Sequence, residues 1–169
     1  MLTIDIGAAV AAIQDGWQEA QRELAGGLEA AVDRAVTEGA AEARSTHRYQ
    51  NRSHDLTDSI QATPPRGGGR AGDVEGEIRA DAGHASFVDA GTSPHVIKAR
   101  NAQQPGKNGK ARKPMLRFRI GGQWVSKEQV NHPGTAPDAF MGRAYQKAER
   151  VLEAELEVAA VRAVERFGR

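Results

Sequence analysis

The stretch His84-Ala-Ser-Phe-Val-Asp-Ala-Gly-Thr-Ser-Pro-His95 combines an alternating segment, a tight corner and a second extended segment. Its first half alternates along the chain: Ala85, Phe87 and Asp89 point one way, and Ser86 and Val88 point the other, as in a half-buried strand. Gly91 can adopt a positive φ without a steric penalty, and Pro94 restricts the residue before it to an extended conformation. We therefore predict a strand over residues 84–90, a corner, and a second strand over residues 95–99.

Two further segments stand on either side of this stretch. Asp55-Leu-Thr-Asp-Ser-Ile60 precedes it, and His132-Pro-Gly-Thr135 follows it, continuing to Phe140-Met-x-x-Ala144. The ordered set of three resembles the neck proteins of tailed bacteriophages, also called head–tail joining or tail-completion proteins. The resemblance covers residues 45–165.

This resemblance implies a structural protein of the virion, located at the head–tail junction and present in the host cytoplasm during assembly. It implies a ring of copies, usually a hexamer, that joins the head connector or stopper to the tail tube or tail terminator. Genomic DNA passes through such a ring without sequence preference. The joining layer, the stopper and the tail terminator all remain open as the position of this chain. The residues that carry the resemblance have a structural role in this interpretation: Leu56, Ser59, Ile60, Phe87, Val88, Asp89, Gly91, Thr92, Pro94, His95, His132, Pro133, Gly134, Thr135, Phe140 and Ala144.

Composition also favours a component of an assembly. Only 5% of the 169 residues are aromatic, which predicts a thin core and makes self-association an expected source of stability. The absence of cysteine excludes disulfides and thiolate chemistry. No apolar run approaches the ~20 residues that span a bilayer, and the N-terminus lacks the positive segment of a signal peptide. We expect a soluble protein without a membrane partner.

Helical periodicity marks both ends of the chain. Apolar residues recur every three or four positions from Ile6 to Arg44, with Gly26-Gly27 in the middle. This pattern predicts two helical pieces or one kinked helix, in which the glycines act as a hinge or allow close packing. Thr135-Ala-Pro-Asp138 predicts the start of a second helix that ends near Phe167.

Strand patterns fill the region between the helices. We predict strands over 56–63, ended by two prolines, and over 74–80, and a hairpin of 116–120 and 123–127 around Gly121-Gly122. The expected fold is a single α+β domain over residues 1–169. It comprises a helical arm over 1–44, a mainly antiparallel sheet of about four to six strands over 56–127, and a long C-terminal helix over 135–167 packed on the sheet.

A basic segment is the main anomaly of the composition. Nine lysines and arginines, and no acidic residue, lie between Asp89 and Glu128. Its loop over 98–113 carries the residues that we expect to contact DNA or a protein partner: Lys98, Arg100, Lys107, Lys110, Arg112 and Lys113. We expect residues 101–113 to be disordered in the isolated protein. The alternative function is a nucleic-acid-binding module that uses residues 98–119, although the loop itself has no aromatic residue for base stacking.

Other residue patterns give no support to catalysis, metal binding or a cofactor. The five histidines, at positions 47, 54, 84, 95 and 132, have neither helical i, i+4 spacing nor cysteine neighbours. His84 and His95 flank the corner, and we expect them to form hydrogen bonds to backbone there. No nucleophile motif surrounds Ser86, Asp89 and His95, and Asp55 with Asp58 is no stronger an acid–base pair. The string Gly67-x-Gly69-x-x-Gly72 lacks the strand and helix that a dinucleotide site needs. We predict a protein that is not an enzyme.

Overall fold

The computed structural model describes residues 6–49, 54–67, 73–99 and 114–168. It confirms the α+β class, with long helices at both ends and antiparallel strand pairs between them. The strands form three two-stranded ladders instead of one sheet. In chain order the elements are α1 (Ile6–Ser45), α2 (Asp55–Asp58), β1 (Ile60–Gly67), β2 (Val74–Ala80), α3 (Ala85–Asp89), β3 (His95–Lys98), β4 (Leu116–Ile120), β5 (Gln123–Lys127), β6 (Gln129–His132) and α4 (Phe140–Phe167).

The chain divides into two compact units. Unit 1 contains residues 1–85 and 138–169, and unit 2 contains residues 86–137. Unit 2 is therefore an insertion between two parts of unit 1. The prediction that residues 1–169 form a single domain stays a prediction.

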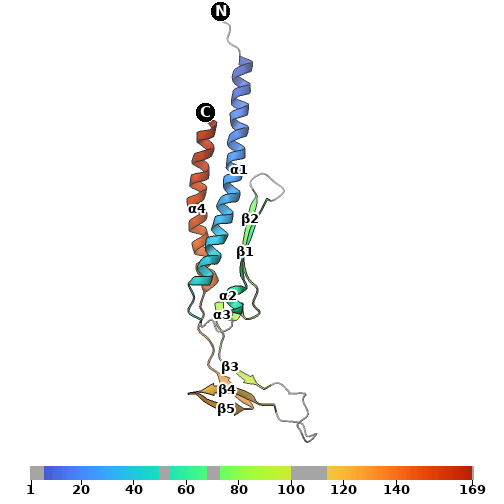
Figure 1. Ribbon diagram of the computed structural model, residues 1–169, viewed down its shortest axis with the longest axis vertical. Helices are drawn as coiled ribbons and strands as arrows, with labels where there is room; N and C mark the ends of the chain where they lie inside the picture. The colour runs from blue at the N-terminus through green and yellow to red at the C-terminus, as the bar shows by residue number, and fades with distance from the viewer. Residues whose placement is uncertain (1–5, 50–53, 68–72, 100–113, 169) are drawn as a thin grey trace, which may run out of the picture. The chain divides into compact units, whose positions relative to one another are not determined.

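Unit 1 is built around the antiparallel pair α1 and α4, with α1 lying between α4 and the β1–β2 ladder (Figure 1). Small residues let the helices approach closely: Ala31, Ala35, Ala40 and Ala43 of α1 and Ala144, Ala159 and Ala163 of α4 are buried. Phe140 and Ile60 are the largest fully buried side chains. An alanine-rich core of this kind buries little apolar area per residue, as the composition predicted.

Helix α1 runs without interruption through Gly26-Gly27. An ideal Cβ on Gly27 would lie 2.6 Å from the Cβ of Ala159, while Gly26 faces open space. The packing interpretation of this glycine pair is therefore confirmed for Gly27. The predicted apolar stripe continues beyond the core, and its N-terminal members are exposed: Val10, Ile13, Trp17 and Leu24.

The first strand begins later and ends later than predicted. Residues 55–58 form the short helix α2, which buries Leu56, and the strand starts at Ile60. The two prolines do not end β1, because the ladder with β2 shifts register between Thr63 and Arg66 and so needs no proline N–H there. The strand Val74–Ala80 is confirmed, and Ile78 is its buried residue.

Unit 2 contains two antiparallel ladders. The predicted hairpin is confirmed as β4–β5, and Gly121 and Gly122 have φ of 55° and 85°, as a two-residue turn with both central residues at positive φ requires. The predicted strand over 95–99 is confirmed as β3, which pairs with β6. Strand β6 was not predicted, because Val130 is the only apolar residue among its four and the segment therefore carries no strand pattern.

Two predictions at the borders of the units are wrong. Residues 85–89 form the helical turn α3, closed by the Ala90 amide on the Ser86 carbonyl at 3.0 Å, and Phe87 is exposed. The segment satisfies its backbone locally because no strand is paired with it. The C-terminal helix starts at Phe140 and not at Thr135, since the Thr135 backbone is already paired with Thr92.

Candidate functional site

Two segments that carry the family resemblance meet in unit 2. The Thr92 amide donates to the Thr135 carbonyl at 2.9 Å, and the Thr135 amide donates to the Thr92 carbonyl at 3.0 Å. This reciprocal pair of hydrogen bonds forms an isolated antiparallel bridge. We call the bridge and its two glycines, Gly91 and Gly134, the paired corner. It joins residues near the entry and the exit of unit 2.

Both glycines of the paired corner are required by its geometry. Gly91 has φ 72° and Gly134 has φ 90°, conformations that side chains rarely adopt. An ideal Cβ on Gly91 would collide with the Thr135 carbonyl oxygen, and one on Gly134 would collide with the Thr92 carbonyl oxygen. The sequence contained a signal for this symmetry that the pattern reading missed: Gly-Thr-x-Pro occurs at 91–94 and again at 134–137.

The histidine pair next to the corner serves the backbone. His95 and His132 are cross-strand partners in the β3–β6 ladder, with ring centroids 5.1 Å apart. His95 Nδ1 donates to the Ser93 carbonyl at 2.8 Å, so its proton is on Nδ1. The Gly134 amide donates to His132 Nδ1 at 3.1 Å, so that nitrogen is unprotonated. The hydrogen bond of His95 confirms the backbone role predicted for that residue at the corner, whereas the hydrogen bond of His132 was not predicted.

The arrangement does not assemble a catalytic triad from Ser86, Asp89 and His95. In such a triad the carboxylate orients the histidine through Nδ1, and here the Ser93 carbonyl occupies that nitrogen. Among the described residues no three His, Cys, Asp or Glu side chains are grouped closely enough to hold a metal ion. The string over 67–72 lies mostly outside the described residues.

The second feature of unit 2 is the arginine–tryptophan face, formed by Arg117, Arg119 and Trp124 on one side of the β4–β5 hairpin. Arg119 is the cross-strand partner of Trp124, and Arg117 is two residues earlier on the same face. The guanidinium carbons of Arg117 and Arg119 lie 5.4 and 5.5 Å from the centre of the indole ring, within the range of cation–π attraction. Trp124 is nevertheless 63% exposed, so most of its surface is available to a partner.

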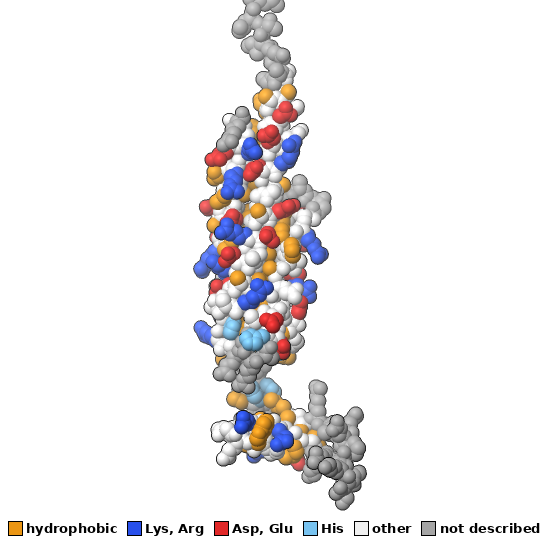
Figure 2. Space-filling model, in the orientation of Figure 1, with side chains coloured by type: hydrophobic (Ala, Val, Ile, Leu, Met, Phe, Trp, Pro, Cys, Tyr) orange, Lys and Arg blue, Asp and Glu red, His pale blue; other side chains and the backbone are white. Residues whose placement is uncertain are grey.

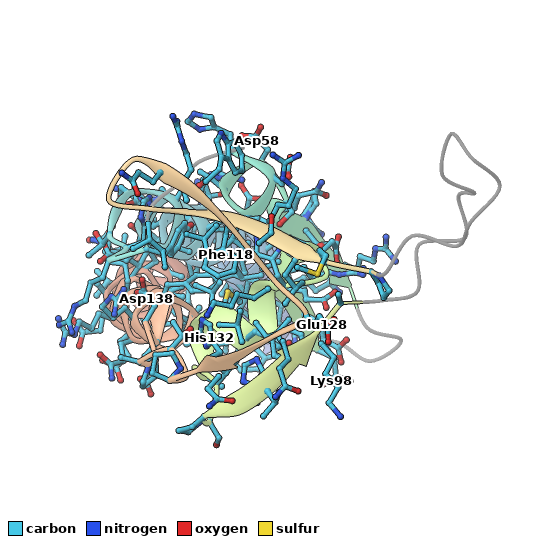
Figure 3. All side chains as sticks on the ribbon, turned by 90° about the horizontal axis from the view of Figure 1, so that it is seen from below. Asp58, Lys98, Phe118, Glu128, His132 and Asp138 are labelled. Atoms are coloured by element: carbon cyan, nitrogen blue, oxygen red, sulfur yellow. The ribbon has the colours of Figure 1, made fainter. Side chains whose placement is uncertain are left out.

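The opposite face of the β4–β5 hairpin carries most of its apolar side chains. Leu116, Phe118 and Val125 lie on the opposite face and are half-buried, as the alternation predicted for the first two. Ile120, on the same face, is exposed. Lys98 is exposed at the end of β3, beside Glu128 (Figure 3). The other five predicted contact residues, Arg100, Lys107, Lys110, Arg112 and Lys113, lie outside the described residues.

Trp124 was not predicted as a contact residue, because the expected contact segment was the loop over 98–113, which contains no aromatic residue. The signal was present in the hairpin prediction itself. A two-residue turn at Gly121-Gly122 places Arg119 opposite Trp124, and cross-strand neighbours of this kind interact directly.

The remaining motif residues build the core of unit 1. Leu56, Ile60, Phe140 and Ala144 are buried, and the Ser59 hydroxyl donates to the Leu56 carbonyl at 2.8 Å. Val88 and Asp89 lie on α3 and are half-buried, while Pro94 and Pro133 adjoin the paired corner.

Asp138 is a buried carboxylate of unit 1, and it connects the segment after α1 with the start of α4. Its Oδ2 accepts hydrogen bonds from the amides of Arg48 at 2.7 Å and Tyr49 at 2.9 Å, and its Oδ1 forms an ion pair with Arg143. Burial raises the pKa of Asp138, but the hydrogen bond from Arg143 and those from the two amides outweigh it, so the pKa is lowered. The sequence predicted only a dipole role for this residue.

Comparisons with models of protein families, with curated proteins and with solved structures find no match for this chain. In the described residues no helix is both long and apolar enough to cross a membrane.

Proposed function

We propose that this chain is a structural protein of the head–tail junction of a tailed bacteriophage. In this proposal it assembles into a ring, with six copies as the expected number, that joins the head connector or stopper to the tail tube or tail terminator. The observation that carries the proposal is the paired corner. Two motif segments about 40 residues apart, which support the resemblance as sequence patterns, are also physically interdependent through Thr92 and Thr135.

Such a protein acts by assembling with copies of itself and with its neighbours in a defined geometry. Copies associate side by side to close a ring, and the two faces of the ring bind the components above and below. Exposed large apolar side chains supply the material for these contacts on both long helices: Val10, Ile13, Trp17 and Leu24 on α1, and Val158, Val161, Val164 and Phe167 on α4.

The test is to locate the chain in assembled particles. Cryo-electron microscopy of virions, with antibody labelling of the chain, should place several copies in one ring between head and tail. A single copy per particle, or no copy at the junction, would remove the proposal. A strain lacking the chain should accumulate filled heads and separate tails.

The arginine–tryptophan face favours a second candidate, a nucleic-acid-binding module. An exposed indole offers a stacking surface for bases, and the two guanidinium groups offer charge to phosphates. The test is the quenching of Trp124 fluorescence by single-stranded DNA, in a Trp17→Phe background so that only one indole reports. A dedicated binder gives tight binding by the monomer with a steep salt dependence, whereas a neck protein gives weak binding without sequence preference.

A further inference from the structure

The two units have opposite net charge. Unit 2 contains nine basic and two acidic residues, a formal charge of +7, and unit 1 contains 14 basic and 20 acidic residues, a formal charge of −6. The near-neutral total of +1 is therefore the sum of two strongly charged parts. On the face shown in Figure 2, unit 2 displays basic and hydrophobic side chains together. This distribution of charge favours a contact in which unit 2 of one copy meets unit 1 of another.

Helix α4 carries a row of acidic side chains on one side, although its five acidic and five basic residues balance and α1, with seven acidic and three basic residues, holds more of the net negative charge of unit 1. Glu149, Glu153 and Glu157 follow one another at i, i+4 spacing, which places them on one side of the helix. All three are exposed, and within the described residues none has an ion-pair or hydrogen-bond partner. Arg150 lies in the same turn but forms no ion pair with them. Like charges at this spacing destabilise a helix by about 0.2–0.5 kcal/mol per pair. We call these three residues the acidic row.

The spacing of the acidic row matches that of the two arginines. Carboxylates four residues apart on a helix repeat every ~6 Å along its axis. Arg117 and Arg119, two residues apart on one face of a strand, repeat every ~6.7 Å. Neighbouring members of the row therefore fit the two guanidinium groups one to one. Val161 and Val164, which are 58% and 71% exposed, lie one to two turns beyond Glu157 and would offer an apolar contact to Trp124 of a second copy.

We propose that the arginine–tryptophan face of one copy binds the acidic row on α4 of a second copy. The proposal rests on the proposed ring, because it names the surfaces through which neighbouring copies contact each other. The contact is heterologous: each copy uses unit 2 towards one neighbour and α4 towards the other, so repetition gives a closed ring or an open filament.

A second copy fits these surfaces better than a nucleic acid does. DNA would neutralise unit 2 and leave the acidic row unpaired, whereas a second copy neutralises both surfaces in one contact. Tryptophan and arginine are also the residue types most enriched at the energetic centres of protein interfaces. Guanidinium groups bind carboxylates with two parallel hydrogen bonds, and two such pairs side by side specify the register.

A charge exchange in the full-length protein tests the contact. Arg117→Glu with Arg119→Glu, and separately Glu149→Lys with Glu153→Lys, should each weaken self-association about tenfold or more in sedimentation at low salt. The chain that carries all four substitutions should recover it. Asp15→Lys with Asp33→Lys on α1 makes the same charge change as the row variant and should leave association unchanged. Since all these side chains are exposed, each variant should melt like the wild type.

A mixing experiment tests the head-to-tail sense. Arg117→Gln with Arg119→Gln leaves only the row functional, and Glu149→Gln with Glu153→Gln and Glu157→Gln leaves only the face functional. Each variant alone should be monomeric, and an equimolar mixture should stop at a dimer. Wild-type protein that stays monomeric at about 0.1 mM overturns the proposal.

The proposal is also overturned if the chain with all four substitutions fails to recover self-association. It is overturned as well if the Arg117 and Arg119 variants lose binding to single-stranded DNA but still self-associate. These failures remain distinct from failure of the proposed function. If the contact fails but copies are seen in a ring in virions, the proposed function stands and other surfaces form the ring. A restored contact with no copy in virions would uphold the contact alone.

Discussion

Gly91 and Gly134 occupy equivalent positions on the two sides of the Thr92–Thr135 bridge. Each has a positive φ, each precedes a bridging threonine, and each leaves the space that the carbonyl oxygen of the opposite threonine fills. The paired corner is therefore a two-sided structure in which each segment leaves space for the other and hydrogen-bonds to it.

Gly91→Ala should destabilise the protein. A side chain at φ 72° costs about 1 kcal/mol, and its collision with the Thr135 carbonyl adds to that cost. Gly91→Val should be worse. Gly83→Ala is the matched control, because Gly83 has open space around it and no positive φ. Thermal unfolding measures the three variants, and equal melting temperatures for Gly91→Ala and Gly83→Ala would contradict the role of the corner.

Thr92→Val should leave stability unchanged or slightly increased. The Thr92 hydroxyl is buried and has no hydrogen-bond partner within the described residues, whereas the bridge uses only the backbone. Valine keeps the shape and removes an unsatisfied polar atom. Chemical denaturation of Thr92→Val and Thr92→Ala measures the effect, with Thr92→Ala expected to be the less stable of the two. A stability of Thr92→Val that falls by about 1 kcal/mol or more would show that the hydroxyl makes a hydrogen bond in the folded protein.

Asp138→Asn should lower stability at neutral pH by about 2 kcal/mol, because the charge-assisted hydrogen bonds become weaker. The pKa of Asp138 is lowered in the folded protein, so its contribution is present above the ordinary carboxyl pKa of 3.8 and is lost as the pH falls through the folded value. The wild type and the variant should therefore converge in acid. Denaturant titrations between pH 7 and pH 2 test this, and Asp81→Asn, on the exposed side of unit 1, is the control. A gap that stays constant into acid would mean that the carboxylate charge is not what stabilises the junction.

The adjacent glycines of α1 should respond in opposite directions to alanine. Gly26→Ala should stabilise the protein by up to about 1 kcal/mol, since alanine favours the helix and nothing lies within 4 Å. Gly27→Ala should destabilise it, because the new methyl group would lie 2.6 Å from the Ala159 Cβ and force α1 and α4 apart. Thermal melting of both variants is the measurement. Stabilisation by both would show that the helices have room to spare at this position.

The success of sequence reasoning here depended on how much of each element was specified locally. Both long helices followed from periodicity, and the hairpin followed from Gly121-Gly122, because these signals lie within the elements themselves. The strand predicted over 84–90 was wrong because five alternating residues are equally able to close one helical turn. The start at Thr135 was wrong because Thr135 is engaged by Thr92, a contact across 43 positions that no local pattern contains.

The candidate surfaces show the same division. The basic character of unit 2 was evident from composition, and Gly91 was identified from its turn signal. Trp124, Gly134 as the counterpart of Gly91, and the acidic row gain their meaning only from pairing or from helix position. All three had a signal in the sequence: the repeated Gly-Thr-x-Pro, the i, i+4 glutamates, and the predicted turn at Gly121-Gly122 that places Trp124 opposite Arg119.

The Thr92–Thr135 bridge gives the chain a natural site for evolutionary change. The bridge joins Thr92 and Thr135, which lie near the two ends of unit 2. The residues between them can therefore increase or decrease in number, or present a different surface, while Thr92 and Thr135 stay at a fixed separation. The alanine-packed helices of unit 1 then experience no change in where the chain leaves and returns. Unit 2 can therefore be exchanged as one segment between the two Gly-Thr pairs, because the bridge holds its ends together whatever surface it presents.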